Sequence, residues 1–269
     1  MKVISQFQHG DIQAFRFGYA PFGKPSMYVH VYFIDGLLID TGQPKMREEI
    51  FSMISDLPVK QIFITHYHED HTGNIEKLAN HFKCPVYSSI ECVEIMKQPP
   101  PISFAQKMVW GDRPAYKELI PINEAISTPH FQFQLIPIPG HAHDMLALYE
   151  PIKKWLFSAD LYVNTRISYY LKGENMKQQI ASTKKILELE FDALLCAHRP
   201  QLNAGKEKLQ KKLVFLEDYY EKVLTLHQAG KSPQQIMKEL HLKESWPIRL
   251  LSGGDLSQLQ MVKSVTDYV

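Results

Sequence analysis

Short apolar runs broken by turn residues fill the first forty positions, which is a pattern typical of β-strands. Asp35-Gly36 stands between two of these runs and favours a hairpin turn. The pattern therefore predicts a strand meander at the start of the chain. Its strands are predicted at residues 2–7, 12–17, 28–33 and 37–39.

Helical and extended patterns alternate after this meander. Pro44 suits the first turn of a helix, which the pattern continues to about residue 55. Residues 98–128 begin with a Pro-rich stretch that excludes regular helix or inner strand there, so we expect an irregular insertion with little regular structure. Further helices are predicted at 73–82, 89–97 and 175–189, and further strands at 60–64, 85–87, 131–138, 145–149, 155–157 and 193–196.

The character of the chain changes near residue 204. Residues 206–229 form a long amphipathic helical pattern, Ser232-Pro233 is a helix start, and a last helix is predicted at about 255–265. The order of elements favours an α/β fold of two sheets covered by helices over a doubly wound parallel sheet. We predict a core over 1–203 and a helical C-terminal region over 204–269 that packs on it, as a lid or as a dimer contact.

The composition is that of an ordinary globular protein. The 269 residues are 45% hydrophobic and 22% charged, and the net charge of +1 lacks the basic excess of a dedicated nucleic-acid binder. The N-terminus lacks the apolar stretch of a secretory signal, and no apolar run approaches the ~18 residues of a membrane span. The three cysteines form no CxxC pair and suit reduced thiols. We expect a cytoplasmic protein without nucleic-acid or membrane partners.

Residues 65–74, with the sequence THYHEDHTGN, hold four metal-capable side chains within six positions. The stretch follows a short apolar strand. Side chains two apart on an extended chain point the same way, so His66 and His68 can face one metal ion. Asp70 and His71 lie where the chain turns and can face a second ion. Polar groups crowded in this way need partners, which favours a metal site over a loop that is rich in histidine by chance.

Three further candidate ligands follow apolar strands elsewhere in the chain. Gly140 lets the backbone approach closely just before His141, and Asp160 and His198 end later strands. Ligands at strand ends sit on a stiff scaffold at the mouth of a cleft. A histidine after a strand carries little weight alone, so the prediction rests on the conjunction with the histidine-rich loop.

On these residues the chain resembles the metallo-β-lactamase-fold superfamily, and in particular its dinuclear, glyoxalase II-like branch. The resemblance covers residues 1 to about 200 and implies an αββα sandwich, here with a helical C-terminal extension. Asn74 is one departure, because the family more often has a second glycine there. The matching positions are His66-x-His68-x-Asp70-His71, His141, Asp160 and His198, with Asp40 in the place of the family's early aspartate.

The resemblance also implies roles for these residues. Imidazoles and carboxylates suit two divalent metal ions, with Zn first and Fe or Mn as alternatives. Such ions lower the pKa of bound water from ~15.7 toward ~7, which implies hydrolysis by a metal-bridging hydroxide with Asp70 and Asp160 in catalytic roles. Asp40 is expected to accept a hydrogen bond from a ligand or from loop backbone. The implied ligands are His66, His68 and His141 for one ion, Asp70, His71 and His198 for the other, and Asp160 as the bridge between them.

Residues that contact substrate are harder to predict. A tyrosine just after the bridging aspartate assists lactone cleavage in some relatives. Tyr162 is therefore a catalytic candidate, although its spacing from Asp160 differs from theirs and packing is the alternative role. We expect a small, anionic substrate. Further candidates for pocket walls or for a proton donor are Phe104, Trp110, His143, Asp144, Arg166, Tyr169 and Tyr170.

The leading interpretation is a dinuclear metal hydrolase of a small ester, thioester or lactone. A phosphodiesterase or nuclease can use the same ligands, but the near-neutral charge counts against it. A mononuclear-iron persulfide dioxygenase is disfavoured because the second ligand set is complete. A non-enzymatic sensor is disfavoured because every ligand position is filled.

Overall fold

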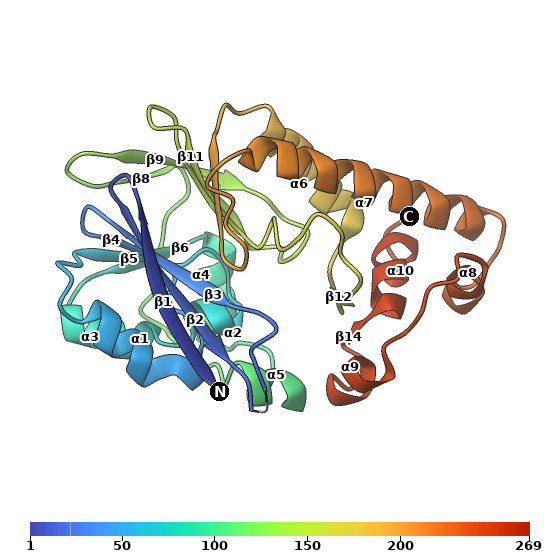
Figure 1. Cartoon of the computed structure of the whole chain (residues 1–269), viewed down its shortest axis with the longest axis horizontal. Coiled ribbons are helices and arrows are strands. Elements are labelled where there is room, and N and C mark those ends of the chain that lie inside the picture. Colours follow the sequence, from blue (N-terminus) through green and yellow to red (C-terminus); the bar gives the residue numbers. More distant parts are fainter. Residues whose placement is uncertain (22) are drawn as a thin grey trace.

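The computed structural model describes residues 1–21 and 23–269 and shows two β-sheets packed face to face, with helices over their outer faces (Figure 1). This is the αββα sandwich with C-terminal helices that the sequence predicts. Within the described ranges, no helix is long and apolar enough to cross a membrane.

In the described residues, the first sheet has seven strands whose spatial order follows the chain. Neighbours from β1 to β4 are antiparallel, which confirms the predicted meander, and neighbours from β4 to β7 are parallel. Parallel neighbours need crossover connections, and helices occupy them. The strands are β1 (Lys2–His9), β2 (Ile12–Tyr19), β3 (Val29–Ile34), β4 (Leu37–Ile39), β5 (Gln61–Phe63), β6 (Val86–Ser88) and β7 (Ile120–Pro121).

The second sheet has the spatial order β13-β11-β10-β9-β8. Its strand pairs are antiparallel except for β11 and β13, whose parallel register shifts between Phe157 and Ala159. Irregularities of this kind redirect the chain at the end of a strand. The strands are β8 (Ala125–Ser127), β9 (Gln132–Pro137), β10 (Leu146–Glu150), β11 (Trp155–Ala159) and β13 (Ala193–Cys196).

An apolar layer lies between the two sheets. On β2, Ile12 and Ala14 face this layer, while Phe15 and Phe17 face the helices outside the first sheet, as the two-residue repeat of a strand requires. Helix α6 and the start of α7 cover the outer face of the second sheet. The helices that accompany the sheets are η1 (Pro44–Met46), α1 (Arg47–Ile54), α2 (Glu69–Thr72), α3 (Ile75–Phe82), α4 (Ile90–Lys97) and α6 (Met176–Leu187).

The C-terminal helices form their own apolar cluster beside the sandwich, on the right in Figure 1. Helix α7 packs along α6, and α10 contacts α6, α7 and the small β12–β14 pair. Helix α9 was not predicted from the sequence, although Trp246-Pro247 begins it with a proline in the first turn. The division into two domains stays a prediction. The elements are β12 (Tyr170–Leu171), α7 (Gly205–Gln228), α8 (Pro233–Glu239), α9 (Trp246–Leu251), β14 (Leu256–Ser257) and α10 (Gln258–Thr266).

The insertion at residues 98–128 is more ordered than the sequence analysis predicts. It contains helix α5 (Phe104–Val109) and the strands β7 and β8, which extend one sheet each. Ser103 and Gln106 form a capping box, with the Ser103 hydroxyl accepting from the Gln106 backbone and the Gln106 side chain accepting from the Ser103 backbone. A Ser-x-x-Gln pattern signals a helix start, and the Pro-rich stretch before it masked that signal.

Candidate metal centre

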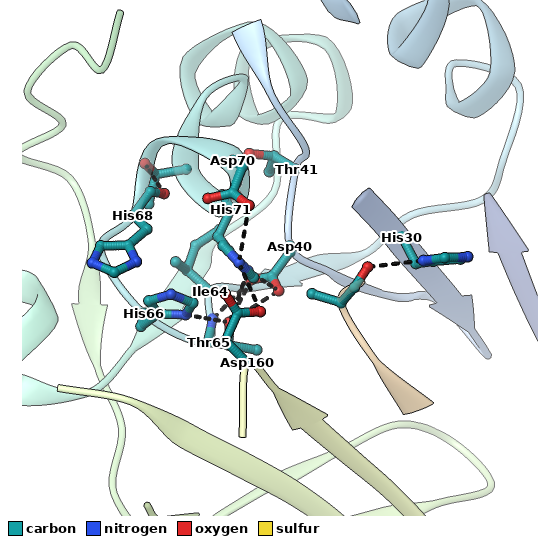
Figure 2. A network of polar contacts seen from close by, with 12 residues as sticks. His30, Asp40, Thr41, Ile64, Thr65, His66, His68, Asp70, His71 and Asp160 are labelled. Atoms are coloured by element: carbon teal, nitrogen blue, oxygen red, sulfur yellow. Dashed lines mark hydrogen bonds and ion pairs between the residues drawn. The ribbon is translucent and has the colours of Figure 1, made fainter. Parts of the chain in front are cut away.

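The histidine-rich loop begins at the carboxyl end of β5, an inner strand of the first sheet. The Thr65 backbone N–H donates to the Asp40 carboxylate at 2.9 Å, and the Tyr67 N–H donates to Asp144 at 2.8 Å. These bonds hold the loop across its length. Helix α2 then follows, and it carries Asp70 and His71. Loop and helix together bring His66, His68, Asp70 and His71 close to one another (Figure 2).

A first cluster joins His66, His68, His141 and Asp160, whose potential ligand atoms all lie within 4.8 Å of one another. The Nε2 atom of His141 lies 3.0 Å from His68 Nδ1 and 3.3 Å from Asp160 Oδ2. Asp160 directly follows the register shift at the end of β11, which turns its side chain toward the histidines. The pairing of His66 and His68 agrees with their predicted spacing on an extended chain.

A second cluster joins Asp70, His71, Asp160 and His198 within the same limit. His198 follows β13, and its Nε2 atom lies 3.1 Å from Asp160 Oδ2 and 3.5 Å from Asp70 Oδ2. The His71 Nε2 atom lies 3.4 Å from Asp160 Oδ1. Asp160 belongs to both clusters, so the arrangement is consistent with a dinuclear metal site that shares one carboxylate.

The donor atoms of these clusters fit bound cations. Within the described residues, His66 Nε2, His71 Nε2 and Asp160 Oδ1 are buried and make no hydrogen bond. Buried polar atoms are costly without a partner, and metal ions are partners that satisfy lone pairs. Nitrogen donors mixed with a few carboxylates are typical of Zn, Fe and Mn. The ligand roles of the seven residues stay a prediction that this geometry favours.

The charges of the site also favour a cation. Burial lowers the pKa of His66 and of His68 well below the usual range, so both rings are neutral and offer lone pairs. Burial also lowers the pKa of His71, but the carboxylates of Asp40, Asp70 and Asp160 outweigh burial and raise that pKa well above its usual value. The carboxylates therefore create a negative potential, which favours the binding of a cation.

Asp40 orients His71, as the sequence analysis expects of a supporting carboxylate. Its Oδ2 atom lies 2.7 Å from His71 Nδ1, and its two oxygens lie 3.1 and 2.9 Å from the Thr65 hydroxyl. A carboxylate accepts, so His71 Nδ1 carries a proton, and Nε2, which lies toward Asp160, would give its lone pair to a bound cation. Asn74 adds a role that the sequence did not reveal, because its side-chain amide donates to the carbonyls of Thr41, Gly42 and Gln43.

The two histidines that follow strands, His141 and His198, are oriented in the same way as His71. His198 Nδ1 donates to the Tyr28 carbonyl at 2.8 Å, which leaves Nε2 for the second cluster. His141 Nδ1 lies 3.4 Å from Glu174 Oε2. Glu174 was not predicted. A carboxylate beside a ligating histidine is expected in general, but nothing in the sequence indicates which acidic residue folds against His141.

Gly140 is required by its position before His141. Its φ of +138° is unfavourable for other residues, and a Cβ atom there would lie 2.5 Å from the Gln179 backbone nitrogen. Gly140→Ala is expected to lower the free energy of unfolding by about 3 kcal/mol or more, because backbone strain and overpacking each cost about 1–3 kcal/mol. Denaturant unfolding measures this loss.

Gly173→Ala is the matched control for that substitution. Gly173 also has a positive φ, at +94°, but a Cβ atom there would meet nothing within 4 Å. The control carries backbone strain alone and is expected to lose less stability than Gly140→Ala. Equal losses of stability in the two variants would show that the close packing of Gly140 against the Gln179 backbone does not limit the size of this residue.

Lys212 is a fully buried lysine on α7 that the sequence analysis did not single out. Its ammonium group donates to the carbonyl of Leu161, the residue after Asp160. Burial lowers the pKa of Lys212 to about 8, and the carboxylates of Glu174 and Asp160 offset part of that effect. Helix α7 therefore places the ammonium group of Lys212 against the backbone that follows β11, one residue after Asp160.

The buried lysine makes a pH-dependent contribution to stability. Below about pH 8 both the folded and the unfolded chain hold the proton, and the cost of burial is fully present. Between about pH 8 and about pH 10.5 only the unfolded chain holds it, so this contribution to stability rises by about 3 kcal/mol. Lys212→Met is expected to remove that rise, as measured by urea unfolding across this pH range. Lys211→Met, at the exposed neighbour, should keep the wild-type slope.

The remaining predicted residues divide into buried, exposed and site-facing side chains. Tyr162 is 2% exposed within an apolar cluster, and its hydroxyl lies 3.1 Å from Thr165 Oγ1, so its catalytic role stays a prediction. The prediction that Tyr170 lines the pocket is wrong, because this side chain is buried among the C-terminal helices and its hydroxyl donates to Gln179. The Trp110 ring does lie beside His198, with centroids 6.2 Å apart. Phe104 is 74% exposed.

The candidates beside the ligands also divide. Asp144 is buried and supports the histidine-rich loop, whereas His143 and Arg166 are exposed and Tyr169 is half-buried. Arg113 was missed by the sequence analysis. It donates to the carbonyls of Tyr67 and Pro100, and its guanidinium lies 3.8 Å from Glu69. These contacts fasten the insertion to the histidine-rich loop.

Comparisons with known proteins agree with this geometry. A family profile described as Metallo-beta-lactamase superfamily matches residues 27–198. A hydroxyacylglutathione hydrolase of Nitrosomonas eutropha is 29% identical over 166 residues, which cover 60% of this chain and 56% of that protein. A Beta-lactamase-like protein 2 homolog of Caenorhabditis elegans is 24% identical over 80% of this chain and 70% of that protein. The chain thus spans little more than half the length of the hydroxyacylglutathione hydrolase.

One solved structure matches nearly the whole chain. It is a metallo-beta-lactamase family protein of Thermus thermophilus, with a TM-score of 0.68 and 17% sequence identity. The match covers 94% of this chain and 91% of that one, so it includes the C-terminal helices as well as the sandwich. At this identity the likeness concerns the fold.

Proposed function

The chain belongs to the metallo-beta-lactamase superfamily, and from this premise we propose that it is a dinuclear metal-dependent hydrolase of small esters, thioesters or lactones. The observation that carries the proposal is the pair of His/Asp clusters that meet at Asp160. Cations bound there would lower the pKa of a water molecule and polarise a substrate carbonyl oxygen.

The residues around the clusters supply orientation. Asp40, Glu174 and the Tyr28 carbonyl each bind the ring nitrogen that faces away from the clusters, so the opposite nitrogens stay aimed at the site. Rigid supports of this kind hold a catalytic centre in its productive geometry before substrate arrives. The Trp110 ring lies beside His198 and would shield that side of a bound substrate from water.

The names of relatives support the thioester within this substrate class. Several curated relatives are named hydroxyacylglutathione hydrolase, a name that states release of a hydroxyacyl group from glutathione. We extend this to the chain as a proposal, because those matches cover only part of each relative. Zn is the metal that we propose first, with Fe or Mn as alternatives.

The experiment that tests the proposal combines metal analysis with a substrate panel. The purified protein is assayed with p-nitrophenyl acetate, an S-hydroxyacyl glutathione, a γ-lactone and bis(p-nitrophenyl) phosphate. Turnover of an ester, thioester or lactone that is lost after chelation and restored by a divalent metal supports the proposal. Turnover of the phosphodiester alone would replace it with a phosphodiesterase, and oxygen uptake with a persulfide would replace it with a dioxygenase.

A further inference from the structure

A cavity of about 680 Å³ lies beside the second cluster, with His198 in its wall. Its wall comes from strands β1 and β2, from the segment that leads into β3, and from the loops after β11 and β13. Small-molecule sites usually have volumes of about 300–1,000 Å³. The cavity is therefore large enough for a compact metabolite, and His198 places it next to the candidate metal centre.

Two arginines give this cavity a positive charge. Arg16 on β2 and Arg199 after β13 both line it, and the lining residues include no carboxylate. In the described part of the chain, neither arginine takes part in an ion pair. Guanidinium groups are matched to carboxylate and phosphate oxygens, which accept two parallel hydrogen bonds. The two charges therefore lack a partner of opposite sign.

The geometry of each arginine suits a ligand. The Arg16 guanidinium lies over the Tyr28 ring at 4.6 Å, and its buried Nε atom makes no hydrogen bond within residues 1–21 and 23–269. Arg199 donates to the Asn164 side-chain oxygen at 3.0 Å, which is a neutral partner. Stacking orients the Arg16 guanidinium, and the amide contact orients that of Arg199, which is exposed. Both guanidiniums keep donors available for an anion.

Besides the two arginines and His198, the wall holds one more basic side chain, His30, which is neutral. His30 is buried, and its Nδ1 donates to the Ala197 carbonyl at 2.8 Å. Burial lowers the pKa of His30 to about 4. Figure 2 shows His30 apart from His66, His68 and His71. Arg16 and Arg199 therefore give the cavity its positive charge. His30 is part of the wall, and its Nε2 atom can accept a hydrogen bond.

We propose that this cavity, the Arg16–Arg199 pocket, binds an anionic oxygen group of the substrate and selects small acyl compounds that carry a carboxylate or a phosphate at the end away from the scissile bond. The proposal rests on the hydrolase function proposed above. His198 belongs both to the pocket wall and to the second cluster, so the pocket adjoins the candidate metal centre. A net charge of +1 for the whole chain favours a small anion over a nucleic acid.

The test compares three chromogenic esters of similar length. p-Nitrophenyl butyrate is neutral, mono-p-nitrophenyl glutarate ends in a carboxylate, and the p-nitrophenyl ester of 4-phosphonobutanoic acid ends in a phosphonate. The metal-loaded wild type is expected to favour at least one charged ester over the neutral one by about tenfold or more in kcat/KM, as a charge-assisted contact allows. The two charged esters distinguish a carboxylate site from a phosphate site.

Arg16→Gln and Arg199→Gln are each expected to lower that preference by about tenfold, mainly through a higher KM for the charged ester. Arg16→Lys keeps the charge and should restore part of the preference. Arg249→Gln is the matched control, because Arg249 also lies over an aromatic ring, at 5.4 Å from the Trp246 centroid, but on helix α9 outside the pocket lining. Thermal unfolding of each variant shows whether the fold is kept.

The outcomes separate this inference from the proposed function. If all esters are hydrolysed without a charge preference, or if the arginine variants keep the preference, the pocket inference is wrong and the hydrolase proposal stands. If no ester is hydrolysed, the hydrolase proposal fails. Calorimetric titration with glutarate then decides on the pocket. Binding that is weakened by Arg16→Gln and unchanged by Arg249→Gln supports the inference, and absence of binding overturns it.

Discussion

Asp160→Asn is expected to reduce hydrolysis by about 10³-fold, which corresponds to several kcal/mol of lost stabilisation. Asp160 is buried, and its oxygens lie 3.1 Å from His198 Nε2, 3.3 Å from His141 Nε2 and 3.4 Å from His71 Nε2. Asparagine has the same shape but no charge, and it presents an amide NH₂ on one side. A single substitution therefore weakens both clusters at the residue that they share.

The measurement is kcat for the best substrate of the panel, with metal content by mass spectrometry of the same samples. Both the turnover and the amount of bound metal are expected to fall. Asp192→Asn makes the same chemical change at an exposed aspartate next to β13 and should leave both quantities at wild-type values. An Asp160→Asn protein with full metal content and full turnover would show that this carboxylate does not join the two clusters.

Asp40→Asn is expected to weaken metal binding by about 10–100-fold without unfolding the protein. Asp40 accepts hydrogen bonds from the Thr65 backbone and hydroxyl and from His71. Asparagine replaces one of the two carboxylate oxygens with an NH₂ group, which donates, so it cannot accept from Thr65 on one side and His71 on the other. If the NH₂ group faces His71, the proton of that ring moves to Nε2, and the lone pair aimed at the second cluster is lost.

The position tolerates asparagine in backbone terms, because Asp40 has a φ of +62° and asparagine adopts this region readily. Competition with a chromogenic chelator measures the metal affinity, and thermal unfolding verifies the fold. Asp35→Asn is the control. Asp35 also has a positive φ, of +47°, and it also contacts a histidine, His130, but on the surface. Equal metal affinity in the Asp40 and Asp35 variants would contradict the orienting role of Asp40.

The grouping of the ligand candidates could be predicted from the sequence because each follows a recognisable strand. The spacing of His66 and His68 on an extended chain gives the first cluster, and the strand ends before His141, Asp160 and His198 explain why distant segments meet. The supporting aspartate, Asp40, was identified through the family resemblance, and the structure explains its position because β4 ends beside β5 in a parallel pair.

The partners that hold this centre could not be predicted. Glu174, Arg113 and Lys212 lie outside any motif, and an acidic or basic residue in a loop or on a helix face is ordinarily solvated. Their roles depend on tertiary contacts between segments far apart in the chain. Local signals were also outweighed at helix α5, where prolines at residues 99–101 hid a capping box.

The central claim is that the two clusters hold one cation each on either side of Asp160. X-ray diffraction from crystals of the metal-loaded protein, recorded at the absorption edge of the bound metal, tests it most directly. The account predicts two anomalous peaks, one among His66, His68 and His141 and one among Asp70, His71 and His198, each beside Asp160. The absence of a peak at either place, or cations bound elsewhere with these side chains turned apart, would contradict it.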